Sequence, residues 1–358
     1  MDIEMRKAER LSVKAGNLVI GGGAPISVQS MTNTDTHNYD ATYAQIKRLE
    51  SAGCDMIRLA VPDLNAVETI RKLKRSDVNI PLVADIHFDY KIAISCADAG
   101  VDKIRINPGN IGSRERVAEV VAACREHEIP IRIGVNSGSL ERELLHKYGS
   151  PTPEALAESA LGHVRILEDL NYDKIVISIK SSDVRAMIQA NRILHDACPY
   201  PLHIGVTEAG SVHIGTLKSA VGIGSLLCDG IGDTIRVSLT ADPIYEVREG
   251  RALLAALGMD ERSLIEIVSC PTCGRTKIDL ISLVSQFENE YLPKLHPSRK
   301  LKVALMGCAV NGPGEAREAD IGIAGGKSEA LLFKHGEIMK KLPESELLDV
   351  LCEEINKL

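Results

Sequence analysis

Short β-branched runs alternate with amphipathic helical stretches along most of the chain, and this alternation restricts the fold more than any other feature. The stretches between the runs carry apolar residues at helical spacing, and two of them end in Gly53 and Gly100, which are typical helix C-terminal signals. Eight strand-then-helix units in succession predict a (β/α)8 barrel of the TIM type. The expected strands are residues 26–30, 56–60, 81–85, 103–107, 130–136, 174–180, 201–208 and 234–239.

The pattern changes after residue 258. A strand-like run at 265–271 is followed by a long amphipathic stretch from Lys277 to about Tyr291, further strand-like runs and a last helix. A chain of 358 residues also exceeds the roughly 250 to 300 residues at which single cores stop growing. The sequence therefore predicts an α/β protein with a barrel domain over 1–258 and a smaller C-terminal α+β domain over 259–358.

Composition excludes some classes of partner. The formal net charge of -7 argues against a nucleic-acid or anionic-membrane surface, because both need a basic face. No run approaches the ~18 apolar residues of a membrane helix, and the first residues lack the apolar run of a signal peptide. Nine cysteines at irregular spacing make a poor disulfide framework and fit a reducing compartment, so we expect a bacterial cytoplasmic protein.

Several expected strands carry polar residues at alternate positions, hence on one face. If that face points into the barrel, the polar side chains converge at its C-terminal mouth, where barrel enzymes keep their active sites. These positions are Arg58, Asp85, Arg105, Asn107, Arg132, Asn136, Ser178, Lys180, Glu208, Arg236 and Ser238.

This set predicts a polyanionic ligand. Several buried cations are costly without anions, and the carboxylates of Asp85 and Glu208 do not balance them. Arginine forks and a lysine ammonium suit phosphate, so a ligand with two phosphates fits the number of donors. The alternative is that some of these arginines face the helices and are paired outside the barrel.

Two residues at strand ends have more than one interpretation. Lys180 is a phosphate ligand or a Schiff-base lysine of the kind found in barrel aldolases. Glu208 is either a general acid–base among the cations or an ion-pair partner that holds an arginine. His87, just after a strand, is interpreted as a packing or hydrogen-bonding residue.

The C-terminal domain contains a CxxC pair, Cys270 and Cys273, and a third cysteine, Cys308, in a turn-rich stretch that we expect to bring Glu315 back toward Cys308. Thiolates at this spacing suit structural zinc, an iron–sulfur cluster with an oxygen ligand, or a redox dithiol, and the spacing leaves all three open. Three other cysteines share faces with apolar residues and are predicted core residues: Cys96, Cys124 and Cys352.

A set of motifs along nearly the whole chain resembles one family. The motifs are VQSMTNTDT, RINPGN, RIGVN, ISIK, VTEAG, SCPTCGR and GCAVNGPGE. Together they resemble the short bacterial form of the 4-hydroxy-3-methylbut-2-en-1-yl diphosphate synthases, iron–sulfur enzymes of non-mevalonate isoprenoid synthesis. The resemblance implies reductive ring opening of 2-C-methyl-D-erythritol 2,4-cyclodiphosphate to 4-hydroxy-3-methylbut-2-enyl diphosphate, with two electrons from flavodoxin or ferredoxin.

The resemblance also implies roles for individual residues. A [4Fe-4S] cluster would be held by Cys270, Cys273, Cys308 and Glu315, and Glu208 would be the acid–base residue. It further implies a head-to-tail homodimer in which the cluster domain of one chain caps the barrel of the other. The expected substrate-binding residues are Arg58, Asp85, Arg105, Asn107, Arg132, Asn136, Lys180 and Ser238.

Two other functions remain as alternatives to this resemblance. One is a Schiff-base lyase that uses Lys180 on a phosphorylated substrate, with structural zinc at the cysteines. The other is a metal-dependent scaffold that binds phosphorylated metabolites without converting them.

Overall fold

The computed structural model describes residues 10–309, 316–326 and 329–358. The chain divides into two compact units, Met1–Met259 and Asp260–Leu358. Each unit has its own hydrophobic core, so each is described by itself.

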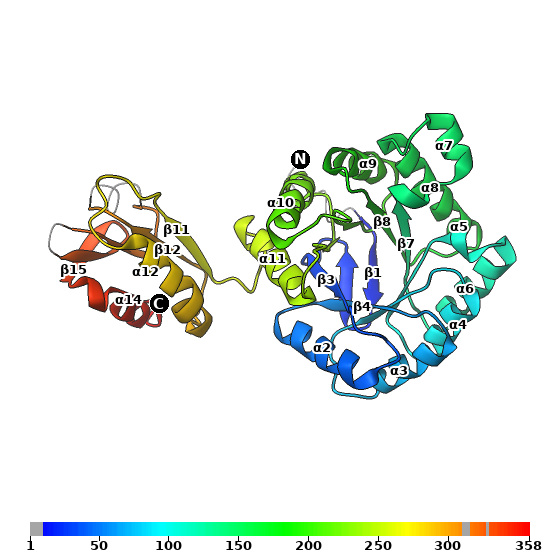
Figure 1. Ribbon diagram of the computed structural model, residues 1–358, viewed down its shortest axis with the longest axis horizontal. Coiled ribbons are helices and arrows are strands. Elements are labelled where there is room, and N and C mark those ends of the chain that lie inside the picture. Colours follow the sequence, from blue (N-terminus) through cyan, green and yellow to red (C-terminus); the bar gives the residue numbers. More distant parts are fainter. Residues whose placement is uncertain (1–9, 310–315, 327–328) are drawn as a thin grey trace. The chain divides into compact units, whose positions relative to one another are not determined.

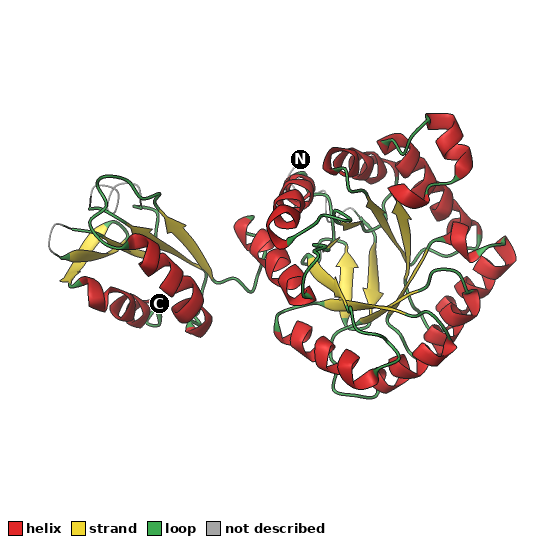
Figure 2. Ribbon diagram, viewed as in Figure 1, coloured by secondary structure: helices red, strands yellow, loops and turns green. Residues whose placement is uncertain are grey.

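Eight parallel strands form the first unit, in the spatial order β8-β7-β6-β5-β4-β3-β10-β9. A parallel bridge between Ile177 and Leu202 joins β8 to the chain just before β9, which closes the sheet into a barrel. The helices surround the strands (Figures 1 and 2). The (β/α)8 barrel expected from the sequence is therefore confirmed. Its strands are β3 (Ser27–Met31), β4 (Met56–Ala60), β5 (Leu82–Asp85), β6 (Lys103–Ile106), β7 (Ile131–Asn136), β8 (Ile175–Lys180), β9 (His203–Ile204) and β10 (Thr234–Ile235).

Most helices of this unit begin at a residue whose side chain caps the first turn, and several are followed by glycine. Asn38 and Asp63 accept hydrogen bonds from the first backbone N–H groups of α2 and α3. Gly53 and Gly100 follow α2 and α4 with φ of 91° and 84°, as their helix-stop positions predict. The helices are α2 (Tyr39–Ser51), α3 (Leu64–Lys74), α4 (Tyr90–Asp98), α5 (Pro108–Ile111), α6 (Arg114–Glu126), α7 (Arg142–Tyr148), α8 (Pro153–Asp169), α9 (Val184–Ala197), α10 (Val212–Cys228) and α11 (Pro243–Ala256).

The two faces of each strand differ in chemistry. On β7, Ile131, Ile133 and Val135 belong to the apolar core between barrel and helices, whereas Arg132 and Asn136 alternate with them. The predicted core cysteines Cys96 and Cys124 are buried in the same apolar layer, and burial raises the pKa of each thiol to about 12. Apolar residues thus fill the outer layer, and polar side chains line the barrel interior toward the carboxyl ends of its strands.

An N-terminal hairpin, β1 (Ser12–Ala15) with β2 (Leu18–Gly21), precedes the barrel and is an element that the sequence did not predict. Its apolar side chains form a small separate core with interior residues near the amino ends of three strands. The hairpin therefore covers the end of the barrel opposite the mouth. The members of this core are Val13, Ala15, Ile20, Met56, Val83 and Val176.

The last two barrel strands are shorter than expected. The sequence predicts strands over 201–208 and 234–239, but the regular ladder contains only two residues of each. Gly205 passes so close to β10 that a Cβ on it would lie 2.4 Å from the carbonyl oxygen of Arg236. The regular pairing ends at this close approach, and the chain beyond it is irregular and polar.

The second unit is a mixed five-stranded sheet with helices. Strands β11, β12 and β13 are parallel, and β13, β14 and β15 are antiparallel. Cys352 is buried on α14 with Leu348 and Leu351, which confirms it as a core residue. The elements are β11 (Ile265–Ser269), α12 (Leu280–Gln286), the π-helical turn η2 (Phe287–Tyr291), β12 (Leu301–Met306), β13 (Ile321–Ala324), β14 (Ala330–Lys334), β15 (Glu337–Leu342) and α14 (Leu347–Ile355).

The helix expected from Lys277 begins three residues later. The side chain of Asp279 caps α12 by accepting from the backbone N–H of Ser282, at 3.2 Å. The backbone N–H of Lys277 instead donates to the carbonyl oxygen of Gly307, at 2.9 Å. This contact ties the segment before the helix to the end of β12 and fixes the helix start. Within the described ranges, no helix combines the length and apolarity that crossing a membrane requires.

Candidate functional site at the barrel mouth

Five basic side chains lie on the interior face of the barrel toward the carboxyl ends of its strands. Arg132 and Arg105 are adjacent on β7 and β6, and Arg105 is adjacent to Asp85 on β5. All but Arg236 were predicted as site residues. We call the five the cation cluster: Arg58, Arg105, Arg132, Lys180 and Arg236.

Asp85 is the shared acceptor of two of these cations. Its Oδ1 accepts a hydrogen bond from Nη1 of Arg105 at 3.1 Å, and its Oδ2 lies 3.6 Å from Nε of Arg58. Burial alone would raise the pKa of Asp85, but the charges of Arg58 and Arg105 and a hydrogen bond from His87 hold it well below its ordinary value. Asp85 is therefore ionised and neutralises only part of the cluster. His87 has the hydrogen-bonding role expected of it, with Nε2 3.5 Å from Oδ2 of Asp85.

Arg132 and Lys180 are buried without a hydrogen-bond acceptor among the described residues. Arg132 is 1% exposed and Lys180 is 6% exposed, and neither Nε of Arg132 nor Nζ of Lys180 has a hydrogen-bond partner within the described part of the chain. Burial, followed by the charges of Arg236 and Arg132, lowers the pKa of Lys180 well below its ordinary value. Burial and the charges of Arg58 and Arg105 likewise lower the pKa of Arg132, but a guanidinium keeps its proton in proteins. An anion at this position would relieve both groups.

The three neutral predicted residues differ in their present contacts. Asn107 caps the short helix α5, because its Oδ1 accepts from the backbone N–H of Gly109 at 3.0 Å. Asn136 is half-buried at the end of β7, directly opposite Lys180 on β8. Ser238 is half-buried just beyond β10. Asn107 thus has a structural role already, and its two amide N–H donors remain for an anionic ligand.

Arg236 and its carboxylate partner Glu246 were not singled out as site residues. Glu246, near the start of α11, lies 3.3 Å from Nη2 of Arg236 and accepts from the hydroxyl of Ser30 at 3.0 Å. It also accepts from the backbone N–H of Leu239 at 3.1 Å. Arg236 shared the alternating pattern that identified Arg105 and Arg132, whereas Glu246 lies on a helix and had no such signal.

A second set of polar side chains lies deeper in the barrel. Lys103 and His203 are fully buried, and both ring nitrogens of His203 lack a partner among the described residues. Burial and the cations Arg132 and Lys180 lower the pKa of His203 well below its ordinary value, so its imidazole is neutral. Lys103 stands two residues before Arg105 in the same strand, and the same alternation would have identified it.

Glu208 follows β9 with a backbone that few residues other than glycine adopt. Its φ is +51°, in the left-handed region, and its side chain is exposed. Nowhere in the described ranges does its carboxylate form a hydrogen bond or ion pair, so the ion-pair interpretation has no support in this structure. Uncommon backbone conformations of this kind occur preferentially at functional sites.

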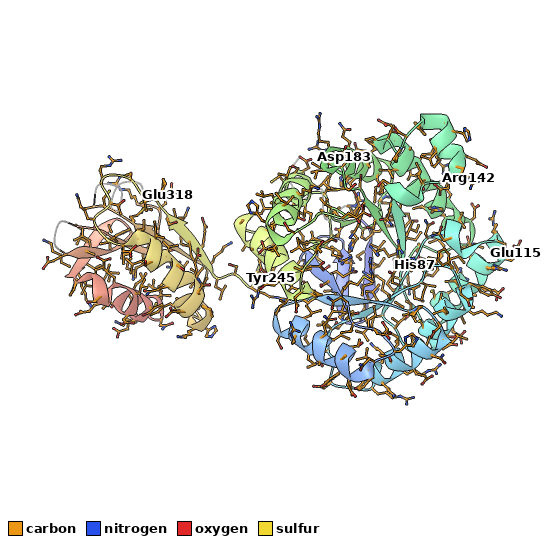
Figure 3. All side chains as sticks on the ribbon, viewed as in Figure 1. His87, Glu115, Arg142, Asp183, Tyr245 and Glu318 are labelled. Carbon is orange, nitrogen blue, oxygen red and sulfur yellow. The ribbon has the colours of Figure 1, made fainter. Side chains whose placement is uncertain are left out.

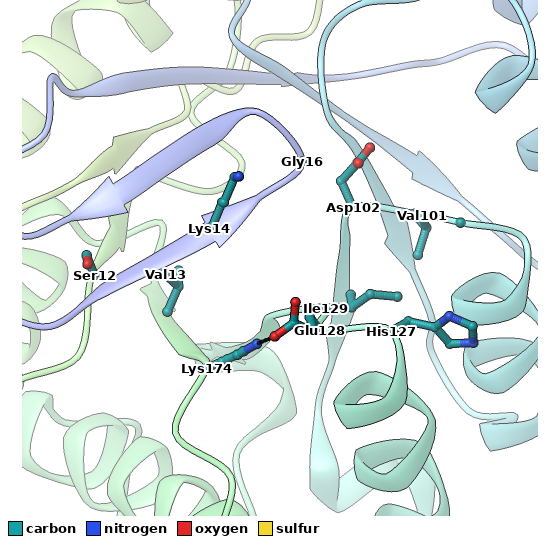
Figure 4. Close-up of a pocket in the computed structure, with 11 residues that line it drawn as sticks. Ser12, Val13, Lys14, Gly16, Val101, Asp102, His127, Glu128, Ile129 and Lys174 are labelled. Atoms are coloured by element: carbon teal, nitrogen blue, oxygen red, sulfur yellow. Dashed lines mark hydrogen bonds and ion pairs between the residues drawn. The ribbon is translucent and has the colours of Figure 1, made fainter.

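Two cavities lie at opposite ends of the barrel. One of about 290 Å³ lies beside the ends of β4 and β5 and is lined by His87 and Phe88, and Phe88 is 72% exposed. Figure 3 labels His87 within the ring of helices. The other, of about 480 Å³, lies by the β1–β2 hairpin and includes an ion pair of 3.0 Å between Lys174 and Glu128 (Figure 4). It contains none of the predicted site residues.

In the second unit, two of the predicted cluster ligands, Cys270 and Cys308, belong to segments that contact each other. The backbone N–H of Gly307, next to Cys308, donates to Sγ of Cys270 at 3.2 Å. Cys308 is 6% exposed, and hydrogen bonds from Arg275 lower the pKa of the exposed Cys273 thiol. Glu315 lies outside the described residues, and no group of three potential ligand side chains occurs within the described ones.

Two domain families cover most of the chain. The GcpE TIM-barrel domain matches residues 10–251, and the GcpE protein C-terminal domain matches residues 266–357. Among solved structures, Yersinia pestis dihydropteroate synthase is similar over 70% of this chain and 100% of its own, with 15% identity and a TM-score of 0.48.

Curated relatives with one shared name are similar over nearly their whole length. The protein of Caldanaerobacter subterraneus subsp. tengcongensis is 58% identical over 99% of both chains, and that of Geobacter sulfurreducens is 56% identical over 98% of both. A Clostridium perfringens protein is 57% identical over 98% of this chain and 99% of its own. Each is named 4-hydroxy-3-methylbut-2-en-1-yl diphosphate synthase (flavodoxin). These similarities favour the synthase over the lyase and the scaffold, and this chain belongs to the GcpE family of 4-hydroxy-3-methylbut-2-en-1-yl diphosphate synthases.

Proposed function

We propose that the barrel mouth is where this chain binds 2-C-methyl-D-erythritol 2,4-cyclodiphosphate and opens its ring to give 4-hydroxy-3-methylbut-2-enyl diphosphate. The observation that carries the proposal is the buried pair Arg132 and Lys180, which lacks acceptors among the described residues. A diphosphate supplies the acceptors and the negative charge that these two groups need.

Within this proposal the cation cluster orients the diphosphate. Arg58 and Arg105 are held in place by Asp85, and Arg236 is held by Glu246. Ser238 and the amides of Asn107 and Asn136 add uncharged donors at the rim. Positioning of this kind removes much of the orientational freedom that the reaction would otherwise lose on the way to the transition state.

The reaction converts substrate, two electrons and two protons into product and one water. Opening of the ring frees a phosphate oxygen, so negative charge develops on the diphosphate beside Arg132 and Lys180. Fixed cations at that position stabilise the developing charge. We assign to Glu208 the general acid–base role, in which it transfers a proton to the departing hydroxyl.

We further propose that Cys270, Cys273, Cys308 and Glu315 hold a [4Fe-4S] cluster in the second domain, 259–358, while the first domain, 1–258, binds the substrate. The donor set fits the group, because thiolates are the usual cluster ligands and backbone N–H donation to sulfur, as from Gly307 to Cys270, tunes such sites. When bound, the cluster would supply the two electrons one at a time.

The relatives' shared name includes flavodoxin, and we propose flavodoxin as the electron donor, with ferredoxin as the alternative. We also propose a head-to-tail homodimer in which the second domain of one chain caps the barrel of the other. The exposed Phe88 at the mouth offers an apolar contact for such a cap.

Metal analysis followed by an activity assay tests this function. Protein purified without oxygen is expected to contain about four irons and four sulfides per chain and to convert the cyclic diphosphate once reduced flavodoxin is added. Cys273→Ser is expected to lose the cluster and the activity. Cys228→Ser, at an exposed cysteine in α10, is the matched control and is expected to retain both. One zinc, no sulfide and no conversion after reconstitution would refute the proposal.

A further inference from the structure

Lys103 is a buried lysine for which the described residues supply no anionic partner. It lies on β6, one interior position nearer the amino end of the strand than Arg105, and its side chain is fully buried. Its Nζ donates to the thioether sulfur of Met56 at 2.9 Å, and no carboxylate of the described residues lies within ion-pair distance of it. A thioether is a weak acceptor that cannot compensate a buried ammonium charge.

The charged and titratable groups that face Lys103 make a positive charge on its amine still less favourable. They are Arg132 from β7, Arg58 from β4 and the neutral His203 from β9. Asp85, on the intervening strand β5, is already ion-paired with Arg58 and Arg105. Burial, followed by the charges of Arg132 and Arg58, lowers the pKa of Lys103 well below its ordinary value.

We propose that Lys103 is an uncharged amine in the empty barrel and takes up a proton when the cyclic diphosphate binds to the cation cluster next to it. The inference rests on the proposed substrate and extends it to a residue that does not touch the ligand. Arg132 and Arg58 both repel an ammonium at Lys103, and both would be neutralised by the bound diphosphate. Loss of that repulsion makes the protonated amine favourable. The charge of Lys103 therefore follows occupancy of the site.

The sign of the resulting pH dependence follows from linkage. Ligand binding that takes up a proton is favoured at low pH and weakens as pH rises between the pKa of Lys103 in the empty and in the occupied barrel. A cyclic diphosphate carries one strongly acidic O–H on each phosphorus and does not itself titrate near neutrality. Proton uptake on binding therefore reports the protein.

Calorimetry of substrate binding tests the proposal. The oxidised holoenzyme is titrated with 2-C-methyl-D-erythritol 2,4-cyclodiphosphate, without reductant so that no turnover occurs, in non-phosphate buffers of different ionisation enthalpy at one pH. The slope of observed enthalpy against buffer ionisation enthalpy gives the number of protons exchanged. We expect uptake of about one proton per ligand in the wild type and an affinity that falls up to about tenfold per pH unit through the window.

Matched variants identify the residue that takes up the proton. Lys103→Met is expected to bind the ligand with a slope close to zero and with little dependence on pH. Lys14→Met, at an exposed lysine of β1, is expected to retain the wild-type slope. Thermal unfolding checks that both variants fold, and the pH dependence of the wild-type affinity tests the proton uptake without any variant.

The outcomes separate this inference from the proposed function. Ligand binding with no proton uptake in the wild type would overturn the role of Lys103 and leave the substrate in place. A slope that persists in Lys103→Met and disappears in His203→Gln would overturn it too, since the imidazole would then carry the proton. No binding of the cyclic diphosphate at all would remove the proposed substrate and the inference together.

Discussion

Arg105 donates a 3.1 Å hydrogen bond to Asp85 from the neighbouring strand, inside the barrel, where the Asp85 side chain is 2% exposed. Asp85→Asn would leave Arg105 and Arg58 without a charged partner. We expect this change to lower the free energy of unfolding by about 3 kcal/mol, because it leaves buried charges uncompensated. Denaturant unfolding at neutral pH measures the difference.

The pH dependence of the same variant provides a second measurement. Because the folded-state pKa of Asp85 is held below its ordinary value, its contribution to stability is present above the unfolded-state pKa of about 3.9 and is lost as pH falls toward the folded-state value. Wild type and Asp85→Asn should therefore converge in acid. Asp98→Asn, in an exposed pair with His127, is the control and should change stability by less than about 0.5 kcal/mol. Equal effects of the two variants would contradict the prediction.

Gly205 should not accept a side chain. A Cβ there would lie 2.4 Å from the carbonyl oxygen of Arg236 and 3.3 Å from Nζ of Lys180. We expect Gly205→Ala to destabilise the barrel by about 1–3 kcal/mol and to weaken binding of the cyclic diphosphate, because β9 and β10 must separate. Gly224→Ala is the control, since nothing lies within 4 Å of the added carbon on α10, and should stabilise by about 0.5–1 kcal/mol. An undisturbed Gly205→Ala protein would show that the two strands can move apart at little cost.

Backbone strain and chemistry can be separated at Glu208. Glu208→Gly relieves the positive φ and is expected to raise the free energy of unfolding by about 1 kcal/mol while ring opening is lost. Glu208→Gln keeps the strain and should lower kcat by about 10²- to 10⁴-fold with little change in KM.

Glu128 supplies the control for that experiment. Its φ is +57°, and it lies by the β1–β2 hairpin at the other end of the barrel. Glu128→Gly should stabilise the protein by a similar amount and leave turnover unchanged. Wild-type turnover in Glu208→Gly would refute the acid–base role.

Mixed dimers test whether a site is shared between chains. In a head-to-tail dimer, a Glu208→Gln chain paired with a Cys273→Ser chain contains one site with an intact barrel and an intact cysteine domain, so about half of the wild-type activity should return. Mixing Cys270→Ser with Cys273→Ser is the control, because neither chain then has an intact cysteine domain. Restoration in the first mixture and not in the second is the expected result. Inactivity of verified heterodimers in the first mixture would place each site within one chain.

The sequence predicted most of the barrel because its strands alternate apolar and polar residues. The expected run 56–60 coincides with β4, and the same alternation identified Arg58, Arg105, Arg132 and Lys180 on the interior face. Period-two patterning is a local property, so it survives in the sequence of each strand.

Other features depend on how distant segments meet. Glu246 acts on Arg236 only because α11 packs against the mouth, and Asn107 is committed to a helix cap that the strand pattern did not indicate. The shortness of β9 follows from the approach of Gly205 to Arg236, which belongs to the next strand. The left-handed backbone of Glu208 likewise has no local signal, since glutamate rarely adopts it.

The hairpin core of Val13, Ala15 and Ile20 closes the amino-terminal end of the barrel. Substrate must then enter, and product and the water formed in the reaction must leave, through the one opening at the mouth. A domain that covers the mouth would control substrate entry and product release together. The rate at which that domain opens would then limit turnover. Weaker contacts between the domain and the mouth would speed product release but would also admit bulk solvent to the reacting ring.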